Sequence, residues 1–173
     1  MVLIIVAATL GASAYTSGTV ERSSNVNVVN DDTGLLALAD GTSGPLVFQN
    51  ASGALEIDFT KGGAGGVNAE SHYELGNPSD AINQSAFKIS NLDAESHDIT
   101  VSYTGAGAGD ADANIEFQIY DSSNTQVATI SEESTSDTIT GAAAGATYYV
   151  VIVVDTNGVT SSTDLSGTLT VSA

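Results

Sequence analysis

The sequence has no cysteine, no tryptophan and only two prolines among its 173 residues. Without cysteine, neither a disulfide framework nor a thiolate metal site can form. Basic residues are also scarce, because three Lys and Arg stand against 21 Asp and Glu and give a formal net charge of -18. Most acidic side chains therefore lack a basic partner, and they predict a solvated acidic surface that repels nucleic acid and anionic lipid.

Such a surface is typical of a protein that works in concentrated salt, where the Debye length falls to about 3 Å near 1 M and repulsion is screened. We therefore expect a protein of hypersaline surroundings that loses stability as ionic strength falls. An ordinary acidic secreted domain is the alternative. Serine, threonine and glycine are abundant and favour strands and turns over helices, so we expect an all-β fold.

The first 14 residues form an apolar N-terminal segment. Residues 1–10 are almost wholly apolar, and residues 11–14 resemble the small-residue end of a signal peptide, although no positive charge precedes them. The run is too short for a membrane span of about 20 residues. Residues 1–14 are therefore either a cleaved leader or a segment retained in an assembly. Both accounts predict a secreted protein that meets a membrane only transiently or through this segment.

Beyond this segment, short runs of alternating apolar and polar residues are separated by turn signals, which is typical of a β-sandwich. Val20, Val26 and Val28 fall on one face of the first run, residues 19–29, together with Arg22. Further strands are expected over residues 35–38, 46–48, 54–59, 71–75, 86–91, 97–103, 114–120, 125–130, 136–140, 146–155 and 167–173. The expected core residues are Leu36, Leu38, Ile57, Phe59, Phe87, Ile89, Ile99, Val101, Ile115, Phe117, Ile119, Val151, Val153, Leu169 and Val171.

One expected strand, residues 147–154, is apolar on both of its faces, so both faces must be covered. One face meets the opposite sheet. The other is covered either by a crossing loop of the same subunit or by a neighbouring subunit. The second account makes Tyr149, Val151 and Val153 a candidate acceptor groove for a strand of another chain.

Motifs for catalysis are missing from the sequence. It has no nucleophile elbow, no phosphate-binding loop and no zinc-binding histidine spacing, so we expect neither an enzyme nor a cofactor. His72 and His97 are interpreted as surface residues. Asp110, Asp112 and Asn114 have oxygen ligands at a spacing suited to a loosely held cation, but they do not form a complete calcium loop.

Two N-glycosylation sequons are intact, and they begin at Asn50 and Asn83. A third, at Asn77, is blocked by the proline that follows it. On a secreted protein, Asn50 and Asn83 are candidate glycan carriers. Chance occurrence in a chain rich in serine and threonine is the alternative.

Several short motifs over about the first 105 residues resemble a known family. Residues 11–22 contain an A-x-[FY]-[TS]-S stretch and an acidic residue next to arginine, and residues 25–38 join a valine-alternating strand to an acidic turn and a leucine-rich strand. These motifs look like the start of a family of small secreted proteins from halophilic archaea. Residues 86–91 and 99–103 are similar to the paired strands of TasA, of camelysin-like proteins and of archaeal bundling pilins.

The resemblance implies a jelly-roll-like β-sandwich over residues 31–173 with an extended N-terminal segment that is donated as a strand to the next subunit. It places the donor strand within residues 15–30, where Val20, Val26 and Val28 enter a groove and Arg22 meets an acid of the acceptor. We therefore expect an extracellular structural subunit of a pilus or biofilm-matrix filament, with copies of itself as partners, candidate N-glycans and no nucleic acid. The alternative is a monomeric cell-surface domain that binds glycan or a cation and is tethered by its N-terminal segment.

Overall fold

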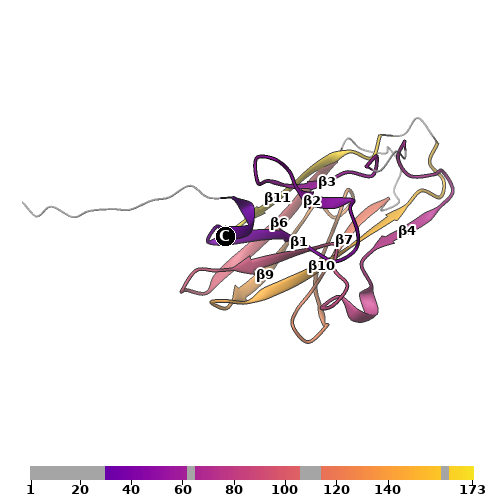
Figure 1. Ribbon diagram of the computed structural model, residues 1–173. Coiled ribbons are helices and arrows are strands. Elements are labelled where there is room, and N and C mark those ends of the chain that lie inside the picture. The colour runs from indigo at the N-terminus through magenta and orange to yellow at the C-terminus, as the bar shows by residue number, and fades with distance from the viewer. Residues whose placement is uncertain (1–29, 62–64, 106–113, 161–163) are drawn as a thin grey trace, which may run out of the picture.

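The computed structural model describes residues 30–61, 65–105, 114–160 and 164–173, which form a nearly all-β structure (Figure 1). The elements are η1 (Asp31–Thr33), β1 (Leu36–Asp40), β2 (Val47–Gln49), β3 (Leu55–Ile57), β4 (His72–Leu75), η2 (Pro78–Asp80), β5 (Phe87–Asn91), β6 (His97–Gly105), β7 (Ile115–Tyr120), β8 (Gln126–Ser131), β9 (Ser136–Ala142), β10 (Thr147–Asp155) and β11 (Gly167–Ser172). Each strand expected beyond residue 30 is found at its place. No helix of the described part could cross a membrane.

The strands form two main sheets that pack face to face, which confirms the expected all-β sandwich. The larger sheet has the order β1-β5-β10-β7-β8, with β4 beside β10, and the smaller has the order β11-β6-β9. A hairpin of β2 and β3 lies near β1. All pairs are antiparallel, and strands far apart in sequence lie side by side, as in jelly-roll and Greek-key sandwiches.

The core lies between the sheets because alternate residues of each strand face inward. In β5, Phe87, Ile89 and Asn91 are buried while the residues between them are not. Tyr103 of β6 meets Phe117 of β7 across the core, with their ring centroids 5.2 Å apart. Seven of the expected core residues are buried between the sheets: Phe87, Ile89, Ile99, Val101, Ile115, Phe117 and Ile119. Val151 is also buried, but in a separate cluster on the outer face of β10, whose inward residues are Val150, Ile152 and Val154. The others are only half-buried: Leu36, Leu38, Ile57, Phe59, Val153, Leu169 and Val171.

The described chain begins and ends at the same end of the sandwich. β1 starts with Leu36 opposite Asn91, at the β5–β6 turn, and β11 finishes with Ser172 opposite Thr100, near the start of β6. Figure 1 shows η1 and the C-terminus together at this end. The opposite end of the sandwich holds the start of β11 at Gly167.

Candidate functional site

The outer face of β10 is covered at its centre by the chain itself. Val151 is fully buried, and it packs against Ala81 and Tyr120, which are 0% and 6% exposed. Tyr149 and Val153 flank it and are half-buried. Of the two accounts for this doubly apolar strand, the structure therefore shows a crossing segment of the same subunit, and Val151 is not open to a second chain in this conformation.

Side-chain amides hold the crossing segment in place. It belongs to the β4–β5 connection, in which Asn77 accepts a hydrogen bond from the Ser79 backbone N–H at 3.0 Å. Asn124 of the β7–β8 turn reaches across to it, where its Oδ1 accepts from Ala81 N at 2.7 Å and its Nδ2 donates to Pro78 O at 3.0 Å. Asn124 has a φ of 59°, a left-handed conformation that asparagine tolerates well. Asn124 thus ties both ends of η2 to the β7–β8 turn.

A second apolar surface lies at the margin of the smaller sheet, beside β11. A cavity of about 460 Å³ opens there between the start of β11, the segment that follows β3 and the larger sheet. Asp58 and Asp164 also line it. Its apolar lining consists of Ile57, Phe59, Val67, Tyr103, Ile115, Phe117, Val154, Leu165 and Leu169.

Among the described residues, this margin lies between the edge of β11 and the segment that follows β3. Within the described ranges, β11 pairs with β6 on one side and with no strand on the other. Leu169 and Val171 stand opposite the buried Tyr103 and Val101, so they face the core, yet both are only half-buried. Leu38 of β1, opposite Ile89, is half-buried in the same way. The cavity, Leu169 and Val171 therefore lie along an edge of β11 that has no paired strand in the described part of the chain.

The start of β11 is fixed by a close approach to Tyr103. A Cβ at Gly167 would lie only 2.3 Å from the Tyr103 hydroxyl oxygen, so the position requires glycine. That hydroxyl donates to Leu165 O at 3.1 Å. Burial raises the pKa of Tyr103 to about 12, with smaller contributions from Glu132 and Asp164. Tyr103 therefore stays neutral near pH 7 and holds this wall of the cavity through a hydroxyl donor.

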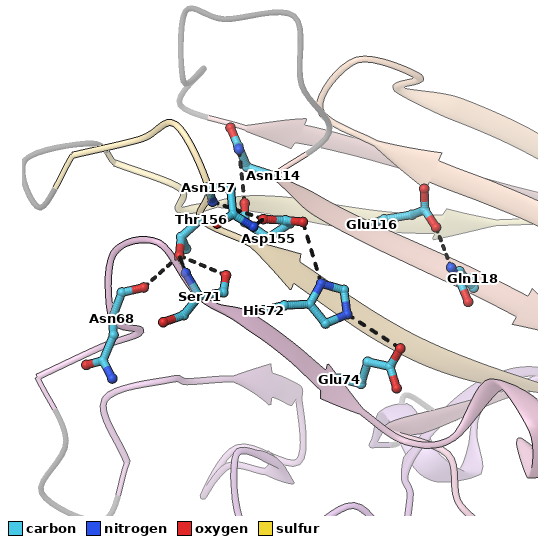
Figure 2. Close-up of polar contacts among 10 residues, drawn as sticks. All are labelled: Asn68, Ser71, His72, Glu74, Asn114, Glu116, Gln118, Asp155, Thr156 and Asn157. Carbon is cyan, nitrogen blue, oxygen red and sulfur yellow. Dashed lines mark hydrogen bonds and ion pairs between the residues drawn. The ribbon is translucent and has the colours of Figure 1, made fainter.

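A polar network closes the end of β10 (Figure 2). Thr156 Oγ1 accepts from Ser71 N at 2.9 Å and lies 2.6 Å from Asn68 O, which joins the entry of β4 to the exit of β10. Asn114 Nδ2 donates to Asp155 O at 3.0 Å. Asp110 and Asp112, the other two residues of the candidate cation site, lie outside the described residues.

His72 lies between two carboxylates in this network (Figure 2). Its Nε2 is 3.5 Å from Glu74 Oε1, and its Nδ1 is 3.5 Å from Asp155 Oδ2. The pKa of Asp155 is lowered chiefly by the backbone N–H of Asn157. The neighbouring Ser71 hydroxyl donates to a backbone carbonyl and not to His72, so the two do not form a nucleophile and its base.

Acidic side chains of the described part have few cationic partners. The ion pairs within 4 Å between described residues all involve histidine, and none joins a carboxylate to Lys or Arg. Lys61 instead lies over the ring of Phe48, with Nζ 2.9 Å from the ring centroid. No three His, Cys, Asp or Glu side chains in the described ranges lie close enough to share a metal ion.

Both candidate glycan carriers lie in connections outside the sheets. Asn50 is half-buried, and its Oδ1 accepts from the backbone N–H groups of Ser52 and Ala54 at 2.9 and 3.1 Å. Asn83 is exposed, whereas Ser85, which completes its sequon, is fully buried. Both assignments remain predictions.

The candidate donor residues, Val20, Arg22, Val26 and Val28, lie outside the described residues, as do residues 1–14. The β11 margin could not be predicted from the sequence, because alternation indicates which side chains face inward and not whether a neighbouring strand is present. No family model matches the chain, and no curated protein matches it significantly.

Proposed function

We propose that this protein is an extracellular structural subunit that assembles into a filament, a pilus or a biofilm-matrix fibre, by donating an N-terminal strand to the next copy. The observation that carries the proposal is the incomplete margin of the sandwich. A strand edge without a partner among the described residues, with half-buried core-facing side chains and a cavity beside it, is the kind of site that strand addition fills.

The N-terminal part of the chain carries a suitable strand. Val20, Val26 and Val28 share one face of residues 15–30, and full burial of a valine side chain contributes about 1.5–3 kcal/mol. Main-chain hydrogen bonds to an open edge add affinity, and the alternate side chains set the register. Donation from each copy to the next is a heterologous contact, which produces a fibre when it does not close into a ring.

The charge of the subunit fits assembly in concentrated salt. Each copy carries a net charge of -18, and the acidic side chains described here have no Lys or Arg partner within 4 Å. Copies packed along a fibre repel one another unless salt screens the charge. The proposed setting is therefore a hypersaline one, with glycans at Asn50 and Asn83 as candidate additions.

Substitution of one donor valine tests the proposal. Val26→Asp should reduce the number of filaments on electron-microscopy grids at least tenfold at equal protein concentration, because it places an unpaired charge in the acceptor. A tenfold change corresponds to about 1.4 kcal/mol, less than such a burial costs. Asn27→Asp adds the same charge on the opposite face and should change the count little. Equal loss in the two variants would argue against strand donation.

The alternative is a monomeric cell-surface domain that binds glycan or a cation and is tethered by its N-terminal segment. One observation favours this alternative: the cavity beside β11 has a volume of about 460 Å³, which falls within the range of small-ligand sites. On this account neither variant alters oligomeric state, since the monomer is the functional form.

A further inference from the structure

We infer that the acceptor groove is the slot beside β11, and that residues 22–28 of a neighbouring copy lie in it antiparallel to β11, with Val26 and Val28 in the cavity. This inference rests on the proposed strand donation. It adds the place where the strand binds and the direction in which it runs.

Two other sheet edges are already occupied by side chains. At β1, Gln49 Nε2 donates to Leu38 O at 2.7 Å and Gln49 Oε1 accepts from Asp40 N at 3.2 Å, so the amide takes the place of a paired strand. At β8, the Thr129 N–H donates to the Asp137 carboxylate at 3.1 Å. Such devices protect an edge against strand addition. The β11 edge shares half-buried, core-facing side chains with β1, and it differs from β1 in that the cavity opens beside Gly167 and Leu169.

The pleat of β11 sets the register of the incoming strand. Directly opposite residues in an antiparallel pair share a face, so the donor valines must stand opposite Gly167, Leu169 or Val171. Gly167 and Leu169 line the cavity. A register with Val28 opposite Gly167 and Val26 opposite Leu169 therefore brings both valines over the cavity, with Val28 beside the Tyr103 hydroxyl that packs against Gly167.

The direction of the strand decides between a filament and a closed dimer. The described chain starts at the end of the sandwich where β11 finishes (Figure 1). An antiparallel donor enters at the other end, near Gly167, so every acceptor keeps its own N-terminal segment free at the opposite end and the chain of subunits stays open. A parallel donor would instead place the sandwich of the donor subunit at the end where the acceptor's own N-terminal segment begins. Two copies could then exchange strands and form a closed dimer.

An exposed apolar pair lies at the end of the sandwich that would contact the next subunit in an open chain. Leu35 and Leu92 are 71% and 51% exposed, and the Leu92 N–H donates to Leu35 O at 2.7 Å. They belong to the end of the sandwich from which the N-terminal segment leaves. In an open head-to-tail chain this end of each donor faces the acceptor, which would cover both leucines.

Arg22 of the donor also finds an acidic surface in this register. It extends past Val171, toward the end of the acceptor that carries Asp31 and Asp32 of η1. An exposed pair of this kind contributes only about 0–1 kcal/mol, so Arg22 assists the register without determining it.

Engineered cysteines test the groove directly, because the chain has no cysteine of its own. In the inferred register Asn25 of the donor stands opposite Thr170, and Thr170 is exposed on the outer face of β11. Full-length Asn25→Cys, Thr170→Cys should form filaments when reduced. On mild oxidation these filaments should yield a ladder of covalent oligomers on a denaturing gel, since directly opposite residues are close enough for a disulfide.

The matched control is Asn25→Cys, Ser166→Cys. Ser166 is exposed near the same edge but lies four residues, about 13 Å, from the inferred partner, and it would stand opposite Asn25 only if the donor ran parallel or in an antiparallel register shifted by four residues. This pair should give no ladder. Covalent dimers through position 166, or disulfides within single chains, would overturn the inference.

Two further outcomes separate this inference from the proposed function. Abundant filaments that cross-link through neither pair would overturn the β11 groove and leave strand donation standing. Absence of filaments from the parent chain under all salt conditions would overturn both.

Discussion

A chain that begins at Asp31 should form no ordered filaments, although its sandwich should fold. The truncation leaves β1 to β11 intact and removes residues 1–30, of which residues 15–30 on our account connect one copy to the next. The shortened chain should therefore be a soluble monomer or an amorphous aggregate formed through its open margin. Electron microscopy and light scattering at equal concentration would distinguish these outcomes from filaments.

A synthetic peptide of residues 15–30 should restore the missing strand to this monomer. At a peptide concentration about 100 times its Kd, the free energy of unfolding should rise by about 2.7 kcal/mol. A peptide that carries aspartate in place of Val26 and Val28 is the matched control and should have little effect. Truncated chains that polymerise as well as the full chain would contradict strand donation.

Val151→Asp should destabilise the isolated sandwich strongly. Val151 is fully buried beneath Ala81 and Tyr120 of its own chain, and an uncompensated buried charge lowers the free energy of unfolding by about 3–5 kcal/mol. Val127→Asp, at a position of β8 that is 38% exposed, should cost at most about 1 kcal/mol. Urea unfolding of the chain that begins at Asp31 gives both values without interference from assembly.

The same pair of variants decides what the outer face of β10 does. If a second subunit covered this face, Val151→Asp would leave the monomer stable and block only assembly. A stable but assembly-deficient Val151→Asp variant would therefore indicate that the acceptor groove is formed by Tyr149, Val151 and Val153.

The strands could be predicted from the sequence because alternation of apolar and polar residues is a local signal. The run from Tyr148 to Val154 also showed that both faces of one strand had to be covered. What covers it could not be predicted, because Ala81 and Tyr120 reach Val151 from distant parts of the chain. The choice between a loop of the same subunit and another subunit required the three-dimensional arrangement.

The β11 margin shows the same limit. Alternation correctly placed Leu169 and Val171 on the core-facing side of their strand. It did not show that both would be half-buried, because burial depends on how many strands the facing sheet contains. Gly167 gave no usable signal either, since its contact with Tyr103 joins positions far apart in sequence.

Helical reconstruction of the assembled fibre by electron cryo-microscopy tests the central claim most directly. We expect a continuous strand of density beside β11 that joins the body of the neighbouring subunit and carries two small side chains into the cavity next to Leu169. A fibre in which this slot is empty, or is filled by a segment of the same subunit, would contradict the account.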